Sequence, residues 1–474
     1  MAATDSLMPL DHFDLTFPPA ALGAPSSIDE QEALRISNAI DDEIKHDQEA
    51  RNRRKHREIK VMLLGQAESG KSTLQKQFQL HYASQTIDHE RPSWRPIVYF
   101  NILKAISMIL NEVDDQYFAS PDNPPHSSSS PANASSSSSS SSSNVAGTTN
   151  SAVADPMWYA ELAYLRGKLL PLVASEDALA AELSGGITVS GGRTGVYVRA
   201  GWQVTDARVP LSDIGNAPSS RSYTMMNIVG KTLAASQNEL KQLWGHAAVV
   251  KLLKEHKLRL EEYAAFFLDN IHRIAQPDYL PSTEDILHVR LQTLGVKEHA
   301  FNINMGATQY SCILYDVGGA RGQRQAWVPY FEDATAIIFL APISAFDQYL
   351  EEDPRTNRID DSLQLFTTIC SNKLLHKATL VLMLNKTDLL RQKLDDGIKV
   401  RKYISSYGDR PNTYEEVSEY FRAHFIQVHK RKDTYNRPLY LHFTSMLDTK
   451  AMQRIIVNVG ESILRTHMAT VGLA

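Results

Sequence analysis

Nine consecutive residues in the first part of the chain have the types and the spacing that bind phosphate groups. They are Gly65, Gln66, Ala67, Glu68, Ser69, Gly70, Lys71, Ser72 and Thr73, and the first eight match the pattern G-x-x-x-x-G-K-[ST]. The glycines allow a tight turn, so that backbone N–H groups face the phosphate oxygens. Lys71 is then expected to contact the β- and γ-phosphates of a nucleotide, and the Ser72 hydroxyl is expected to ligate Mg²⁺.

The segments on either side of this loop favour a binding site over a plain turn. Residues 59–64 form an apolar run that is typical of a buried strand, and residues 73–80 are typical of a helix. A glycine-rich turn before a helix is the simpler interpretation of the motif. The strand and the helix both fall where phosphate binding needs them, so the sequence favours a P-loop.

A second motif, Asp316-Val317-Gly318-Gly319, follows directly after the apolar residues 313–315. An acid at a strand end is where a P-loop enzyme holds its magnesium ion, often through a water molecule. Gly319 lets a backbone N–H approach the γ-phosphate without a Cβ atom in the way. By itself the motif fits a turn equally well, but after a P-loop it indicates a nucleotide site.

A third motif, Asn385-Lys386-Thr387-Asp388, ends the apolar run 380–384. The Asp388 carboxylate can accept hydrogen bonds from N1–H and from the exocyclic amine of guanine. Adenine has no such pair of donors, so ATP would leave this carboxylate without partners. The stem of Lys386 can cover the base. In this order, the three motifs predict a guanine-nucleotide site.

Composition limits the class of protein further. The chain has 474 residues, a net charge of −5 and a pI of about 6.4, which gives no indication of nucleic-acid binding. Cys312 and Cys370 lie in apolar segments, which favours a reducing compartment over a disulfide framework or a metal cluster. No apolar run approaches the roughly 20 residues that span a bilayer, and no signal peptide is evident. We therefore expect a soluble, intracellular protein with two domains.

Residues 1–57, which precede the P-loop strand, have little core of their own. Residues 1–28 are expected to be a disordered N-terminus, and residues 29–57 to form a helix. Its apolar stripe consists of Ala33, Ile36, Ile40 and Ile44. Such a narrow stripe suits docking onto a partner. The basic run at 51–57 is either a solvated helix face or a contact to an anionic membrane.

Beyond the P-loop helix, residues 85–284 have helical patterns and no strand pattern of comparable strength. Helices are predicted at 99–113, 158–183, 225–253 and 258–274. Two insertions interrupt them, a serine-rich low-complexity segment at 119–155 and a glycine-rich segment at 184–224. The first is expected to be a disordered loop because its composition cannot build a core. The second is expected on the surface, with possible short strands at 196–198 and 202–204.

Strand-like runs return near residue 285 and alternate with helices. Strands are predicted at 301–303, 311–316, 336–340, 380–385 and 439–444, and helices at 361–371, 414–430 and 448–468. This alternation favours a mostly parallel sheet that is covered on both faces. The predicted α/β domain is therefore split into residues 58–84 and 285–474, and residues 85–284 form an inserted all-α domain.

With these motifs in this order, the chain resembles the α subunits of heterotrimeric G proteins. The resemblance runs from about Ile36 to the end of the chain, apart from the two insertions. Five further stretches support it, at residues 267–270, 273–277, 285–290, 412–416 and 430–434. It implies a P-loop GTPase domain with an inserted helical domain, GDP or GTP as the ligand, and Mg²⁺ as the cofactor.

The resemblance also implies roles for individual residues. Arg290 resembles the arginine that stabilises charge on the transferring phosphoryl group, so Arg290 and Lys71 are the expected catalytic residues; without this context Arg290 would be read as an exposed helix-end arginine. Thr293 resembles the second hydroxyl ligand of Mg²⁺ beside Ser72, and Asp316 would act through water. Further nucleotide contacts are implied for Leu287, Gly319, Asn385, Lys386, Asp388 and Met446.

The partners implied by the resemblance are a βγ dimer, a seven-helix receptor, effectors and GTPase-regulating proteins. The helix at 29–57 and Trp327 would face the βγ dimer, with an effector as the alternative partner of Trp327. Residues 448–474 would contact the receptor. The protein would then reach the cytoplasmic face of the plasma membrane through partners, because Ala2 stands where myristoylation needs glycine and no cysteine for palmitoylation lies nearby.

Several residues depart from the family pattern. Ala320 stands where the family has the water-orienting glutamine, and Ala67 stands where the P-loop has glycine, with its Cβ toward the γ-phosphate. Groups that handle protons or orient water contribute on the order of 10²–10⁴ in rate. We therefore predict GTP binding with very slow turnover, unless Gln323 acts as a substitute. His246 and Ala247 also fail to match the Asp-Ser pair of the helical domain.

Two other classes of function are weighed against this switch enzyme. The first is a non-hydrolysing, GTP-dependent interaction module, which Ala320 and Ala67 favour, whereas Arg290 and Thr293 favour the enzyme. The second is an ATP-dependent P-loop kinase, which the guanine motif disfavours.

Overall fold

The computed structural model describes residues 27–118, 156–184, 221–255, 257–258, 260, 262–305 and 308–471. The chain forms two units, Met1–Arg57 and Glu58–Ala474. Residues 119–155, most of the glycine-rich segment and the possible strands at 196–198 and 202–204 lie outside the described residues.

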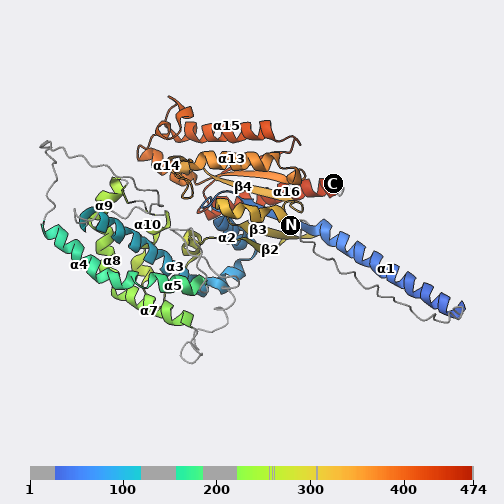
Figure 1. Cartoon of the computed structure of the whole chain (residues 1–474), viewed down its shortest axis with the longest axis horizontal. Helices are drawn as coiled ribbons and strands as arrows, with labels where there is room; N and C mark the ends of the chain where they lie inside the picture. The colour runs from blue at the N-terminus through green and yellow to red at the C-terminus, as the bar shows by residue number, and fades with distance from the viewer. Residues whose placement is uncertain are drawn as a thin grey trace, which may run out of the picture. The chain divides into compact units, whose positions relative to one another are not determined.

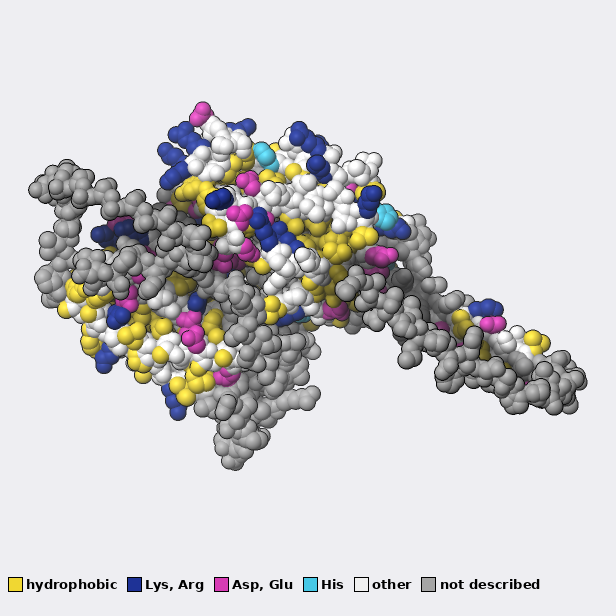
Figure 2. Space-filling view, viewed as in Figure 1, with side chains coloured by type: hydrophobic (Ala, Val, Ile, Leu, Met, Phe, Trp, Pro, Cys, Tyr) yellow, Lys and Arg dark blue, Asp and Glu magenta, His cyan; other side chains and the backbone are white. Residues whose placement is uncertain are grey.

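The first unit contains a single described helix, α1 (Ser27–Arg57). Its apolar side chains are at least 49% exposed at Leu34, Ile36, Ile40 and Ile44. Figure 2 shows hydrophobic side chains on this helix among charged ones. The helix therefore presents an uncovered apolar stripe.

The second unit is built around a sheet of six strands within the described residues, in the order β2-β3-β1-β4-β5-β6 (Figure 1). The strands are β1 (Glu58–Leu64), β2 (Val296–Met305), β3 (Thr308–Val317), β4 (Ala336–Pro342), β5 (Thr379–Asn385) and β6 (Leu439–Thr444). All neighbouring pairs are parallel except β2 and β3, which form an antiparallel hairpin. The prediction of a mostly parallel sheet is confirmed.

Helices cover both faces of this sheet because the side chains of each strand alternate between the faces. Ile59, Val61 and Leu63 of β1 pack on one face with residues of α2 and α16, whereas Met62 and Leu64 pack on the other with residues of α13 and α15. The covering helices are α2 (Lys71–Tyr82), α13 (Arg358–Ser371), α14 (Thr387–Asp395), α15 (Tyr414–Lys432) and α16 (Thr449–Val471). Short helical turns are η3 (Arg321–Tyr330), η4 (Ile343–Asp347), η5 (Lys373–Leu375), η6 (Val400–Lys402) and η7 (Ser405–Tyr407).

Most of the described residues between α2 and β2 are helical, and they have a hydrophobic core of their own, which extends to Ile286 and Val289. The elements are α3 (Ser84–Val113), η1 (Asp114–Phe118), α4 (Pro156–Val173), α5 (Glu176–Ser184), α7 (Arg221–Ala235), α8 (Gln237–Gly245), α9 (Ala247–Lys254), α10 (Glu262–Asp269), α11 (Ile271–Ile274) and α12 (Thr283–His288). The helix predicted at 225–253 is three helices. One break lies at His246, whose extended backbone ends α8 and whose Nδ1 accepts the Ala248 N–H to begin α9.

One helical stretch among the described residues, Ser84–Phe118, is long and apolar enough to cross a membrane. However, 72% of its apolar window is buried inside the protein. This stretch therefore has the character of a core helix. The sequence analysis did not find it because polar residues such as Asn101 and Lys104 interrupt the run.

Candidate functional site

The P-loop connects β1 to α2 at the carboxyl edge of the parallel strands. Lys71 begins α2, and its ammonium group donates to the carbonyl oxygens of Gly65 (3.0 Å) and Gln66 (2.7 Å). Burial lowers the pKa of Lys71 to about 8, although the Asp316 carboxylate acts in the opposite direction. The buried Ser69 hydroxyl has no hydrogen-bond partner among the described residues. The loop thus offers a lysine and a hydroxyl to an anionic ligand.

Gly70 brings this loop against the predicted guanine motif. Its φ is 102°, and a Cβ atom at this position would lie 2.4 Å from Nδ2 of Asn385. The same Asn385 amide donates to the Ser69 carbonyl oxygen (2.8 Å), while Asn385 Oδ1 accepts from the Thr444 hydroxyl (3.1 Å). Only glycine fits this joint between the P-loop and the ends of β5 and β6.

The rest of the guanine motif begins α14. Lys386 has a left-handed φ of 66°, and its Nζ contacts both carboxylate oxygens of Glu262 at 2.7 and 2.8 Å. Asp388 lies exposed in the first turn of α14. Met446 is buried, and its carbonyl oxygen accepts from the Gln77 amide (2.7 Å). The motif therefore links the sheet edge to α10 of the helical region.

The three residues predicted to bind Mg²⁺ meet although they are far apart in the sequence. Ser72 Oγ lies 2.7 Å from Asp316 Oδ2 and 2.9 Å from Thr293 Oγ1, and the Thr293 hydroxyl donates to Asp316 Oδ2 (3.0 Å). The other carboxylate oxygen of Asp316 is buried without a hydrogen-bond partner among the described residues. An oxygen cluster with an unsatisfied buried carboxylate oxygen is the donor set that Mg²⁺ prefers, so these residues fit the ion.

The segment after Asp316 lies directly against the P-loop. A Cβ atom on Gly319 would lie 2.5 Å from both the Ala67 nitrogen and Lys71 Nζ, so the close approach requires glycine. Ala320 precedes η3 and carries no polar side-chain atom. Gln323 of η3 approaches the same region. A Cβ atom on Gly318 would lie 1.7 Å from Gln323 Oε1 and 2.8 Å from the Thr293 carbonyl oxygen. The Gln323 side chain therefore lies directly beside Gly318.

Arg290 follows α12 and is held by two other elements. Its backbone N–H donates to Asn101 Oδ1 (2.8 Å) in α3, and its guanidinium donates to the carboxylate of Glu68 in the P-loop. Burial acts to raise the pKa of Glu68. The guanidinium groups of Arg358 and Arg290 nevertheless lower this pKa to about 2. Arg290 is therefore paired with an ionised P-loop acid.

Other residues from the sequence analysis lie elsewhere. Leu287 is buried in α12, and Thr73 lies in α2 after the predicted metal ligand. Trp327 is 2% exposed and donates its indole N–H to the Gly318 carbonyl oxygen (2.9 Å). The expectation that this indole faces a partner therefore does not fit the structure, and its neighbour Val328 is 50% exposed instead.

The sequence analysis missed two residues of the site, Arg358 and Glu262. The side chain of Gln66 points to α13 and bonds with Arg358, which the analysis did not consider. Glu262 lies beside Lys386, and the His246 ring packs against Trp158 within the helical region. An acid in the first turn of a helix was the available signal for Glu262. No local pattern pairs Gln66 with Arg358, because they are 292 residues apart.

Comparison with known proteins agrees with this geometry. The family model described as "G-protein alpha subunit" matches residues 34–463. The chain is 32% identical to the guanine nucleotide-binding protein alpha-4 subunit of Mycosarcoma maydis, over 89% of this chain and 85% of that protein. It is 27% identical to the alpha-1 subunit of the same organism, over 95% of this chain and 100% of that protein. With its P-loop, its split sheet and its helical insertion, the chain belongs to the G-protein alpha subunit family.

Proposed function

We propose that this chain is a GDP/GTP switch that hydrolyses GTP very slowly. It would bind guanine nucleotide with Mg²⁺, exchange the nucleotide when a membrane receptor engages the C-terminal segment, and release a βγ dimer when the γ-phosphate orders the switch segments. The observation that carries this proposal is the meeting of Ser72, Thr293 and Asp316, which belong to three separate elements.

The side chains divide the work around the phosphates. Lys71 and Arg290 supply positive charge for the transferring phosphoryl group, and the N–H of Gly319 lies against the P-loop where a γ-phosphate would be held. Bound Mg²⁺ would neutralise charge on the β- and γ-phosphates. Asn385 connects the guanine motif to the P-loop through the Ser69 carbonyl oxygen, and Asp388 would read the base.

Slow hydrolysis follows from Ala320 and Ala67. A methyl group cannot orient the attacking water, and a Cβ at residue 67 occupies space on the phosphate side of the loop. The Gln323 side chain lies beside Gly318, next to the proposed γ-phosphate position, which supports residual water orientation by this side chain. We expect a rate well below the value of about 10⁻² s⁻¹ that is typical of the class.

Partner binding is assigned to surfaces outside the nucleotide site. The exposed apolar stripe on α1 supports docking of the βγ dimer, and the exposed Val328 of η3 would be part of the contact. The α16 helix and the residues after it would contact a receptor. Contact with the cytoplasmic face of the plasma membrane would then come through these partners.

The alternative is a GTP-dependent interaction module without hydrolysis, which Ala320 favours. Single-turnover hydrolysis of GTP preloaded with Mg²⁺ distinguishes the two functions, with Arg290→Ala for comparison. Slow hydrolysis that Arg290→Ala lowers further supports the switch enzyme. Tight guanine binding with no hydrolysis above the Arg290→Ala background supports the module. Displacement of a labelled guanine nucleotide by ATP would contradict both.

A further inference from the structure

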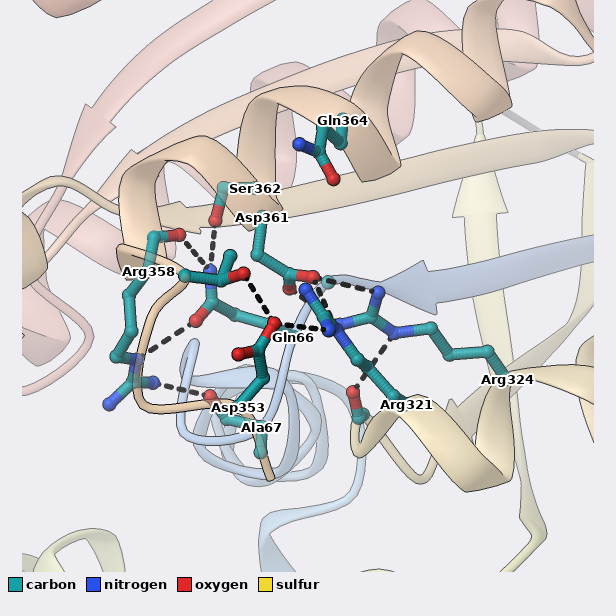
Figure 3. A network of polar contacts seen from close by, with 12 residues as sticks. Gln66, Ala67, Arg321, Arg324, Asp353, Arg358, Asp361, Ser362 and Gln364 are labelled. Atoms are coloured by element: carbon teal, nitrogen blue, oxygen red, sulfur yellow. Dashed lines mark hydrogen bonds and ion pairs between the residues drawn. The ribbon is translucent and has the colours of Figure 1, made fainter. Parts of the chain in front are cut away.

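Gln66 lies in the P-loop, but its side chain bonds with residues of α13. It is 1% exposed and points to the start of α13 (Figure 3). Its amide N–H₂ donates to the Arg358 carbonyl oxygen (2.6 Å) and to the Ser362 hydroxyl, and its Oε1 accepts from Arg358 Nε (2.9 Å). All of these bonds are buried, so losing one partner leaves a polar group unsatisfied.

Arg358 returns from α13 to the same loop. Its Nη2 donates to the Ala67 carbonyl oxygen (2.6 Å), and its Nη1 donates to Glu68 Oε2 (2.8 Å) and to Gln348 Oε1 (3.0 Å). The planar guanidinium thus bonds with three consecutive residues of the P-loop at once. A lysine, with one ammonium group, cannot reproduce this fork.

Glu68 is the residue that most needs this support. Its φ is 61°, a left-handed conformation that strains the backbone of a non-glycine residue. Arg358 holds the carbonyl group before Glu68 and also one oxygen of its carboxylate. The other carboxylate oxygen accepts from Arg290. One ionised carboxylate therefore connects Arg358 to the predicted catalytic arginine.

Neighbouring charges do not compete for Arg358. Asp361, one turn further along α13, forms ion pairs with two arginines of η3 (Figure 3). Arg321 Nε lies 3.1 Å from Asp361 Oδ1, and Arg324 Nη2 lies 2.6 Å from Asp361 Oδ2. Among the ion pairs of the described residues, Glu68 is the acid that pairs with Arg358. The Gln66 bonds then fix the guanidinium in the orientation that Glu68 requires.

We propose that Gln66 and Arg358 form a brace that positions Glu68 and, through its carboxylate, Arg290. Gln66 and Arg358 are positioning residues, since neither is assigned a contact with the reacting atoms, and the inference rests on the proposed role of Arg290 in phosphoryl transfer. Displacing a catalytic group by about 1 Å can cost 10²-fold in rate. Loss of the brace is expected to lower hydrolysis about tenfold by letting Glu68 and Arg290 move.

The first test follows Arg290 directly in the full chain with GDP bound. The Nε–H resonance of its guanidinium is assigned by its loss in Arg290→Lys. We expect Gln66→Met, which keeps the volume but removes the hydrogen bonds, to broaden or shift this resonance. Arg358→Lys should do the same if Gln66→Met folds poorly. Gln364→Met makes the same chemical change on the exposed side of α13 and should leave the resonance unchanged.

A double-mutant cycle supplies the second test. Gln66→Met should slow single-turnover hydrolysis in the Arg290 protein and have no further effect in the Arg290→Ala protein. Equal effects in both backgrounds, or an unchanged Arg290 resonance in folded Gln66→Met and Arg358→Lys, would overturn the brace. If the wild-type protein binds GTP without hydrolysis, the proposed GTPase activity fails, and the resonance alone decides the brace.

Discussion

Lys386 and Glu262 form a two-pronged ion pair between residues that are 124 positions apart, with Nζ 2.7 and 2.8 Å from the two carboxylate oxygens. Lys386 belongs to the base-reading motif, and Glu262 begins α10 of the inserted helical region. The pair therefore joins the two regions that a bound nucleotide is expected to contact. Its strength is open to direct measurement.

Glu262→Gln is expected to speed release of GDP. The Glu262 side chain is 47% exposed, so the pair should contribute about 0.2–1 kcal/mol, and the release rate should rise by a factor of about 5 or less. Dissociation of a fluorescent GDP analogue measures this rate, and the difference between the proteins should shrink in high salt. Asp409→Asn, which breaks the exposed pair with Arg401, should leave the rate unchanged.

Ala320→Gln is expected to restore hydrolysis. An amide at this position can orient the attacking water, and we expect the single-turnover rate to rise about 10–100-fold, with Ala67 limiting the gain. Ala326→Gln adds the same side chain at an exposed position of η3 and should have no effect. A wild-type rate that already reaches the class value and falls in Gln323→Ala would instead assign water orientation to Gln323.

Thr293→Ala is expected to weaken the binding of Mg²⁺ to the GTP-bound protein. The Thr293 hydroxyl lies within hydrogen-bond distance of both Ser72 and Asp316, and a bond to a charged group contributes about 1.5–3 kcal/mol. The free Mg²⁺ concentration that half-protects bound GTP from release should therefore rise at least tenfold. Chelation of Mg²⁺ should abolish the difference between the variant and the wild type. Equal Mg²⁺ requirements would contradict the ligand assignment.

Lys76 is expected to make stability depend on pH. Burial lowers its pKa to about 7, with Asp316 acting in the opposite direction, whereas the ordinary value is 10.5. The unfolded chain then binds more protons between these values, so the free energy of unfolding rises as the pH rises through this window. Urea unfolding should give a shallower rise for Lys76→Met than for the wild type. Lys168→Met, at an exposed position, should keep the full rise.

The sheet and the three motifs were predictable because each is encoded locally. An apolar run that ends in Asp316 or Asn385 predicts a strand, and parallel strands gather their carboxyl ends at one edge. The meeting of Ser72 with Asp316 follows from that rule. Helix breaks were less predictable, because the apolar period continues through His246 and hides the change of direction there.

The side-chain pairs that support the site were not predictable from local patterns. Gln66 with Arg358, and Lys386 with Glu262, depend on how distant elements pack. The burial of Trp327 was missed for the same reason, since its indole finds a partner in the Gly318 carbonyl group. Such pairs can be identified only once the distant elements are packed together in the fold.

The register of the antiparallel hairpin of β2 and β3 determines the distance between Thr293 and Asp316 in the predicted metal site. Val296 pairs with Val317 and Met305 pairs with Thr308, so the register is fixed along the whole hairpin. Thr293 lies just before the first pair, and Asp316 belongs to the second. A slip of two residues would separate their side chains by about 7 Å, more than a shared ion can bridge. Insertions at the hairpin turn should be tolerated, whereas a single added residue inside either strand should separate Thr293 from Asp316.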